Sequence, residues 1–362
     1  MLWATSGTRA GERKKNYQTP YGEVVVGRHA YQRGTGGALV VPLEERGRIV
    51  GGTATPKFAQ MVSWKYAQLP ASKVEEDMRL NHARPTSRKL VQRLGRCVGE
   101  IAWDKEFEWA YELPVFEEVV RHISISRDGT TTAILGEGYR ETMCGTISFY
   151  NGKGDRLHTI YSACAPQHGK ENFDLVMDME IGRVKEGYPK VDYLGLADGS
   201  KDNWTYLQRH TGLGILDFFH ASEHLADVSV VLKKYGAARK TWLEEACHDL
   251  KHMPKGAQQI LRELRHFRST VSGDVPEVLH ETITYFENNQ HRMKYAHYQK
   301  MGYPIGSGVT EAACKVVVKH RLNGSGMRWN LEPVEHMLLL RGLICTTGRW
   351  EQFWKHFDKN GL

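Results

Sequence analysis

The middle of the chain shows the alternation and the continuous apolar runs that are typical of strands in one sheet. His122–Asp128 alternates hydrophobic and polar residues with period two, and Val191–Ala197 is a nearly continuous apolar run. The predicted elements are, in order, strands at 122–128, 141–150 and 157–164, a helix at about 169–186, a strand at 191–197, a helix at about 201–210 and a strand at 214–219. This order predicts a mixed α/β sheet.

Helical patterns lie before this sheet. Residues 56–103 read as helices, with Pro56 able to open the first and Pro70 separating it from the second. A third helix, at about 86–102, carries four basic residues, Arg88, Lys89, Arg93 and Arg96. A short helix, a turn and a basic helix outline a helix-turn-helix, so these four residues are candidate DNA contacts. A small helical bundle with a solvated basic face is the alternative.

The remaining segments complete the domain organisation. Residues 22–43 predict a small hairpin with a glycine-rich break, residues 225–303 show helical patterns only, and an amphipathic helix begins near residue 309. We therefore expect a disordered basic tail at 1–16, a β-hairpin region at 17–50, a helix-turn-helix-like domain at 51–118, an α/β core at 119–224 and 304–345, a helical insertion at 225–303 and a C-terminal tail at 346–362.

Charge and cysteine content narrow the class of protein. The 362 residues carry a net charge of +7, and residues 1–100 hold 17 basic against 8 acidic side chains. A basic front end suits a polyanion-binding module, although a solvated surface explains it equally well. The six cysteines form no CxxC pair, which argues against a zinc ribbon. The first 30 residues lack an apolar signal segment and no apolar run suits a membrane span, so we expect a cytoplasmic, nucleoid-associated protein without a membrane partner.

Three acids stand where a metal site would need them. Asp128 is expected to end the first core strand and Asp198 the fourth, and ligand sites in α/β sheets gather at the carboxyl ends of strands. If these strands are parallel neighbours, the two carboxylates lie side by side. Glu311 falls in the first turn of the helix after the helical segment, and it completes the group if that helix packs back on the sheet.

Such a group suits phosphodiester chemistry. Two Mg²⁺ ions about 4 Å apart activate the attacking oxygen and stabilise the leaving one. Mg²⁺ prefers carboxylate, water and phosphate oxygens, and we expect Mn²⁺ to substitute. Taken singly, each acid has an ordinary explanation, because Asp-Gly is a turn signal and an acid favours the start of a helix.

Four segments carry a resemblance to a known family. Leu196–Trp204, Ile215–Leu225, Pro304–Lys315 and Gly324–Trp329 resemble motifs of bacterial insertion-sequence transposases of the ISKra type. These belong to the DDE group with a ribonuclease H-like fold and are distantly similar to Mutator-like transposases. The resemblance covers roughly 120–345 and, more weakly, 17–103.

The resemblance implies a function and its residues. Asp128, Asp198 and Glu311 correspond to the catalytic, metal-binding acids, and the long second gap accommodates the helical insertion. Asp217 and His220 look like the Asp-x-x-His signature of the Mutator-like relatives, which implies DNA contact or support of the site, with a capping or packing histidine as the alternative. Arg127 departs from the apolar or small residue expected before Asp128.

We therefore expect a Mg²⁺-dependent DNA transposase that acts as a homo-oligomer on double-stranded transposon ends and target DNA. Lys315 and Lys319 are further candidates for phosphate contacts, with a solvated face as the alternative. Two rival functions remain open: a catalytically inactive, domesticated transposase that only binds DNA, and a ribonuclease H-like nuclease that only hydrolyses.

Overall fold

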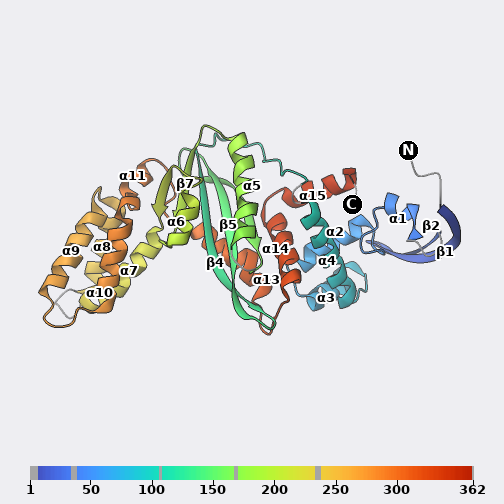
Figure 1. Cartoon of the computed structure of the whole chain (residues 1–362), viewed down its shortest axis with the longest axis horizontal. Coiled ribbons are helices and arrows are strands. Elements are labelled where there is room, and N and C mark those ends of the chain that lie inside the picture. Colours follow the sequence, from blue (N-terminus) through green and yellow to red (C-terminus); the bar gives the residue numbers. More distant parts are fainter. Residues whose placement is uncertain (1–6, 34–38, 106–107, 167–169, 233–237, 361–362) are drawn as a thin grey trace. The chain divides into compact units, whose positions relative to one another are not determined.

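The computed structural model describes residues 7–33, 39–105, 108–166, 170–232 and 238–360, and it divides into two compact units (Figure 1). The first, which we call the terminal unit, comprises Met1–Pro114, Thr132–Arg140 and Val317–Leu362. The second, the central unit, comprises Val115–Thr131 and Glu141–Val316. No helix among the described residues is both long enough and apolar enough to cross a bilayer.

The central unit is built on a five-stranded sheet with the order β6-β5-β4-β7-β8. Its strands are β4 (His122–Ile134), β5 (Gly138–Tyr150), β6 (Arg156–Cys164), β7 (Asp192–Ala197) and β8 (Leu213–Leu216). β5 pairs antiparallel with β6, whereas β7 is parallel to both β4 and β8. The mixed α/β sheet predicted from the order of the patterns is therefore confirmed.

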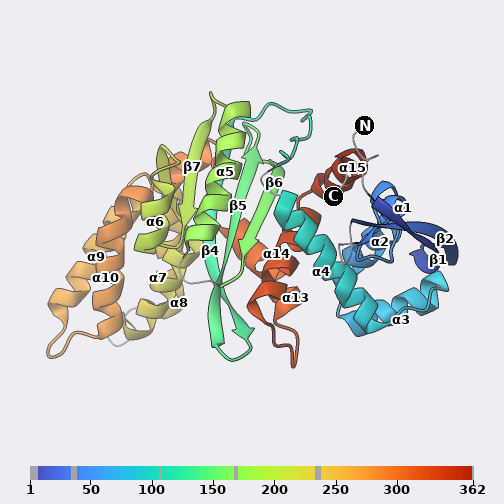
Figure 2. The ribbon, with the colours of Figure 1, turned by 45° about the vertical axis from the view of Figure 1, so that its right-hand side comes forward.

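Helix α5 (Glu171–Gly187) covers one face of this sheet (Figure 2). Its buried residues include Phe173 and Met177, which face β5 at Gly145. A Cβ atom at Gly145 would lie 2.6 Å from the sulfur of Met177 and 2.9 Å from the ring of Phe173. The glycine is thus needed for the close approach of helix and sheet.

The predicted helical stretch contains helices and no strand in its described part. Four helices, α7 (Phe218–Leu232), α8 (Arg239–His252), α9 (Gly256–Thr270) and α10 (Glu277–Asn289), pack in sequence and close on each other through a contact between α10 and α7. A 3-10 turn (Gln290–Arg292) and α11 (Tyr295–Lys300) follow, and α12 (Gly308–Ala313) returns the chain to the sheet. Helix α6 (Lys201–Leu207) connects β7 to β8.

The start of the terminal unit corrects one expectation. Residues 7–16, which we expected within a disordered tail, belong to β1 (Gly7–Thr19), which pairs antiparallel with β2 (Gly22–Arg33). The turn between them follows Thr19, whose hydroxyl donates to the carbonyl oxygen of Gly22 and accepts from its N–H. Backbone pairing with β2 along the length of β1 forms this strand although its side chains are mostly polar. A short β3 (Leu39–Val40) pairs with β2, and the glycine-rich break between them lies mostly at 34–38, outside the described residues.

Helices form the rest of this unit, and their starts follow the sequence signals. α1 (Pro42–Arg46) precedes α2 (Pro56–Tyr66), which begins at Pro56 as expected, and α3 (Ala71–His82) begins directly after Pro70. α4 (Arg88–Lys105) is the predicted basic helix, and Ser87 accepts a 3.2 Å hydrogen bond from the backbone N–H of Leu90 at its start.

Helix α4 lies at the centre of the terminal unit. It packs against α2, α3 and α14 (Leu331–Cys345), and α15 (Arg349–Asn360) packs on α14. A Cβ atom at Gly95 would lie 2.1 Å from the Tyr66 ring, and one at Gly99 would lie 2.5 Å from the Cβ of His336. Residues 317–345, which we had assigned to the α/β core, therefore group with α4, because α14 buries its apolar side against that helix.

Candidate active site

Asp128 and Asp198 lie on neighbouring parallel strands. The register of β4 and β7 pairs Ser126 with Leu196, two residues before each aspartate. Asp198 directly follows the last residue of β7, as predicted, whereas Asp128 lies inside β4 and not at its end. The difference arises because β4 continues to Ile134 and turns directly into β5, so its pairing extends beyond the site.

Helix α12 places Glu311 on the same side of the sheet. The Thr310 hydroxyl lies 2.6 Å from the hydroxyl of Thr146 on β5, and the sulfur of Cys314 lies 3.8 Å from the Oδ2 of Asp128. Glu311 sits between these two anchors, in the first turn of the helix. The condition set by the sequence, that this helix return to the sheet, is met.

Asp217 joins the segments that carry the other groups. It is fully buried; its Oδ2 accepts hydrogen bonds from the backbone N–H and the hydroxyl of Ser307, and its Oδ1 accepts one of 2.9 Å from the backbone N–H of His220. Its own N–H donates to the carbonyl oxygen of Ala197 at the end of β7. The carboxylate of Asp217 thus connects the starts of α7 and α12, and its backbone N–H connects them to β7.

His220 lies between two carboxylates at the exposed side of the site. Its Nε2 is 3.8 Å from Glu311 Oε1, and its Nδ1 is 3.2 Å from Glu223 Oε2. Glu311 also accepts a 3.0 Å hydrogen bond from the hydroxyl of Ser307. The imidazole is 38% exposed, so it contacts Glu311 and remains accessible to a ligand.

The electrostatics of Asp128 reflect crowded carboxylates. Burial raises the pKa of Asp128, and the charge of Asp198 raises it further, against the lowering effects of the Gly129 N–H, His220 and Cys314. Among the described residues, no Lys or Arg nitrogen lies within 4.0 Å of Asp128, Asp198 or Glu311. A group of acids without a protein cation is a site that a bound cation would stabilise.

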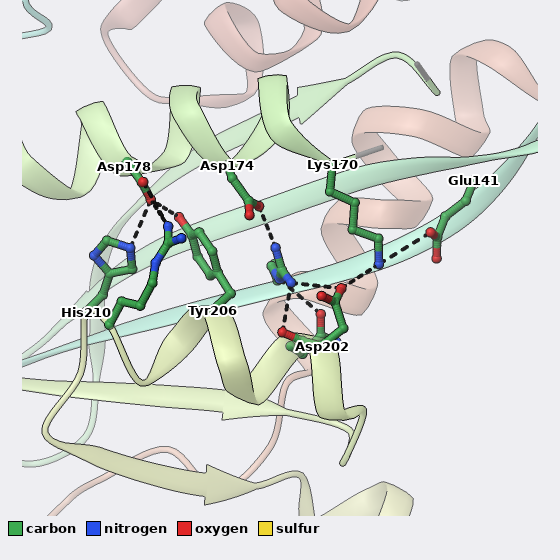
Figure 3. Close-up of polar contacts among 10 residues, drawn as sticks. Glu141, Lys170, Asp174, Asp178, Asp202, Tyr206 and His210 are labelled. Atoms are coloured by element: carbon green, nitrogen blue, oxygen red, sulfur yellow. Dashed lines mark hydrogen bonds and ion pairs between the residues drawn. The ribbon is translucent and has the colours of Figure 1, made fainter. Parts of the chain in front are cut away.

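A buried arginine beside these acids has other partners (Figure 3). The side chain of Arg127 is 1% exposed and forms ion pairs with Asp174 and with Asp202, the latter at 2.9 Å. Figure 3 labels both of these carboxylates. Its Nε donates a 3.1 Å hydrogen bond to the Oδ1 of Asn203, and its guanidinium lies 4.3 Å from the ring centroid of Tyr206. The positive charge of Arg127, which interrupts the apolar pattern of β4, is therefore neutralised by Asp174 of α5 and Asp202 of α6.

Asn203 connects this cluster to the site. Its Nδ2 donates a 3.2 Å hydrogen bond to the Oδ1 of Asp198, which also accepts one of 3.0 Å from the backbone N–H of Ser200. Arg127 and Asn203 were not among the residues predicted for the site. The signals were present, because Arg127 is an unusual charge in a buried strand and Asn203 falls within the Leu196–Trp204 motif.

The remaining acids near this cluster are paired with protein cations, as Figure 3 shows. Lys170 lies 2.9 Å from Asp202 and 3.4 Å from Glu141, and its hydrogen bond is the main reason that the pKa of Asp202 is lowered. Asp178 accepts hydrogen bonds from Arg209 and the hydroxyl of Tyr206. These carboxylates are therefore poor candidates for metal ligands.

The donor set of the three acids fits a hard divalent cation, because every available ligand atom is an oxygen. Their oxygens do not all lie within 4.8 Å of one another; within the described ranges, the one compact group of three potential ligands is Glu100, Glu332 and His336 in the terminal unit. That group combines two helices, but Glu332 is exposed and Glu100 lies 3.6 Å from Arg96.

The basic residues predicted to contact DNA are exposed. On α4, Arg88 pairs with Glu75 at 2.8 Å, Arg93 donates to the hydroxyl of Thr53, and Lys89 and Arg96 are also at the surface. Lys315 and Lys319 lie on a π-helical segment, Cys314–Lys319, that continues α12, and both are exposed.

No protein-family model matches the chain, and no curated protein is significantly similar to it.

Proposed function

We propose that the chain is a DNA transposase of the DDE group, which cuts transposon ends and joins them to target DNA. The observation that carries the proposal is the placement of Asp128, Asp198 and Glu311 on two parallel neighbouring strands and on the helix that follows a helical insertion. The sheet order, with three consecutive strands on one side and two parallel strands on the other, is compatible with a ribonuclease H-like fold, which we include in the proposal.

The three acids would hold two Mg²⁺ ions, with Mn²⁺ as a substitute. When bound, such ions activate the attacking oxygen and stabilise the leaving oxygen of the phosphodiester. Asp198 is held in one orientation by Asn203 and Ser200, and Asp128 is half-buried beside it. This preorganisation reduces the loss of side-chain freedom when a cation and a scissile phosphate bind.

His220 and Asp217 would support the site in different ways. Asp217 is buried and fully hydrogen-bonded, so it holds the starts of α7 and α12 in register with β7. His220 is accessible and contacts Glu311, so it would orient that carboxylate and contact the DNA backbone.

Double-stranded transposon ends and target DNA are the proposed partners, bound by a homo-oligomer in the nucleoid. The support is the exposed cations of α4 together with Lys315 and Lys319. Counterion release from such contacts makes binding depend steeply on salt.

The test is a nicking and strand-transfer assay with the full chain on labelled DNA that carries the ends flanking the coding sequence. Wild type should nick and join in Mg²⁺ or Mn²⁺. Asp198→Asn should abolish both reactions and keep DNA binding, because only the ligand is lost. Asp274→Asn, an exposed acid in the loop between α9 and α10, is the control and should behave as wild type.

The outcomes separate the rival functions. Hydrolysis without joining would assign a ribonuclease H-like nuclease. DNA binding without any metal-dependent cleavage would assign an inactive, domesticated transposase. Full nicking by Asp198→Asn would remove this aspartate from the site and overturn the proposal.

A further inference from the structure

The terminal unit contains a pocket of about 620 Å³ along the basic face of α4. Its lining comes from α4, from the end of α2 and the start of α3, from residues 326–330 and from α14. Five of the lining residues are Lys or Arg, and none of the described residues that line it is acidic; the five are Lys89, Arg93, Arg96, Arg321 and Arg328. Several positive charges gathered in a concave, low-dielectric site produce a focused positive potential, which attracts an anion.

Arg321 is the buried member of this group. It is 2% exposed, its guanidinium carbon lies 4.8 Å from the ring centroids of both Tyr66 and Trp329, and its Nε donates to the carbonyl oxygen of Tyr66. Trp329 is itself held by a 3.0 Å hydrogen bond from its indole to the carbonyl oxygen of Leu322.

No carboxylate of the described residues lies within 4.0 Å of the Arg321 guanidinium, unlike that of Arg127. An arginine stays protonated even when it is buried, so a buried guanidinium without an anion is costly. An anionic ligand would offset this cost.

The rest of the lining indicates what the anion is attached to. Apolar and aromatic side chains line the pocket beside the cations: Tyr66, Pro333, Met327, Trp329, Met337 and Leu340. A volume of this size matches pockets that enclose an organic molecule, which span roughly 300–1,000 Å³. Phosphate recognition beside aromatic and apolar surface is how proteins bind unpaired nucleotides.

The shape of the pocket also bears on the role of α4. A recognition helix enters the major groove of duplex DNA, about 12 Å wide, with its reading face free. The basic residues of α4 instead line a pocket together with residues 326–330. An unpaired nucleotide can enter such a pocket, whereas a duplex groove would have to accommodate residues 326–330 as well as the helix.

We propose that this pocket binds an unpaired nucleotide of a DNA strand, with Arg321 and Arg328 contacting its phosphate. The inference rests on the proposed DNA transposase function and adds to it a site for single-stranded DNA, distinct from the site of cleavage. The helix-turn-helix role of α4 stays a prediction; the inference assigns to the α4 cations that line the pocket an additional contact with a single strand.

The test measures binding of the full chain by fluorescence anisotropy to three probes: a single-stranded oligonucleotide, a blunt duplex and a duplex with a single-stranded overhang. Single-stranded and overhang probes should bind at least about tenfold more tightly than the blunt duplex. Arg328→Ala should weaken single-strand binding about tenfold and lower the slope of log K against log salt by about 0.7, the value for one lost phosphate contact.

Arg321→Met keeps an unbranched apolar chain between the two rings and removes the charge, so it should weaken binding at least as much. Arg328 is exposed and its removal leaves the fold intact, so Arg328→Ala decides the question if Arg321→Met does not fold. Arg268→Ala, an exposed cation at the end of α9, is the matched control and should bind as wild type.

Unchanged single-strand binding by Arg328→Ala, or preference for the blunt duplex, would overturn the inference. Nicking by wild type is measured in parallel on the same protein. If nicking occurs but the pocket variants bind normally, the pocket inference alone fails. If single strands bind in the pocket but no metal-dependent cleavage occurs, the proposed catalytic function alone fails.

Discussion

Asn203 donates a hydrogen bond of 3.2 Å to the Oδ1 of Asp198, and the same side chain accepts one from the buried Arg127. The amide nitrogen of Asn203 thus bonds to the candidate active site, and its amide oxygen bonds to the ion-pair cluster around Arg127. Because Arg127 is fixed by three further contacts, it holds Asn203, and Asn203 in turn holds Asp198.

Loss of this hydrogen bond should weaken metal binding at the site. Removing a residue that orients a metal ligand typically costs about 10- to 100-fold in metal affinity or activity. Asn203→Ala is therefore expected to shift the Mg²⁺ concentration for half-maximal nicking upward within that range, with DNA binding unchanged. Gln208→Ala, at the exposed end of the same helix, is the control. An unchanged Mg²⁺ dependence would show that Asn203 does not position Asp198.

Arg127 should matter for stability far more than an exposed arginine of the same cluster. Arg127→Met leaves Asp174 without its buried partner. Breaking a fully buried pair costs about 3–5 kcal/mol, and we expect the lower end, about 3 kcal/mol, because Asp202 is more than half exposed. Arg209→Met removes an exposed pair with Asp178 and should cost no more than about 1 kcal/mol. Urea unfolding of both variants measures the difference, and equal costs would contradict the structural account.

The pH dependence of stability should reveal the crowded acids. Burial and the charge of Asp198 raise the pKa of Asp128 above its ordinary value of 3.8. The folded state therefore binds more protons than the unfolded state, and this contribution to stability is lost as pH rises from 3.8 through the folded pKa. Since asparagine cannot ionise, Asp128→Asn should be stabilising at pH 7 without divalent ions and nearly neutral in acid.

Thermal unfolding at several pH values, with EDTA and then with Mg²⁺, checks this expectation. Mg²⁺ should stabilise wild type more than Asp128→Asn, because the variant lacks one ligand. Asp274→Asn removes an exposed carboxylate and controls for the change in net charge. A destabilised Asp128→Asn at pH 7 in EDTA would mean that this carboxylate supports the fold.

The contact between α5 and the sheet predicts opposite effects of two glycine substitutions. Gly145→Ala places a methyl group 2.6 Å from the sulfur of Met177, so it should destabilise the protein by about 1–3 kcal/mol. Gly182→Ala lies within α5 with no atom within 4 Å of the new Cβ, so it should stabilise by about 0.5–1 kcal/mol. Chemical denaturation of the two variants tests the register of helix and sheet, and equal effects would contradict it.

The sequence by itself determined the elements that local patterns encode. The alternation at His122–Asp128 and the apolar run at Val191–Ala197 correspond to β4 and β7, and the prolines at 56 and 70 mark the starts of two helices. Such features depend on the periodicity of neighbouring side chains or on the fixed φ of proline, so a short window of sequence contains the information.

Sequence patterns gave wrong predictions at two strands whose extent depends on pairing with another segment of the chain. The polar residues of β1 gave no strand signal, because the hydrogen bonds that hold them come from β2 and not from their own alternation. Asp128 was expected at a strand end, but β4 continues through it because β5 pairs with the segment beyond. A single window cannot contain either partner.

Only the tertiary structure decided how distant residues meet. The parallel register of β4 and β7 brings Asp128 and Asp198 together across 70 positions of chain, which no spacing rule requires. The same packing gave Arg127 its partners, made Asp217 a buried support, and turned the basic face of α4 into the wall of a pocket with Arg321. Their roles follow from burial and from partners far along the chain, and these arise only when the elements pack.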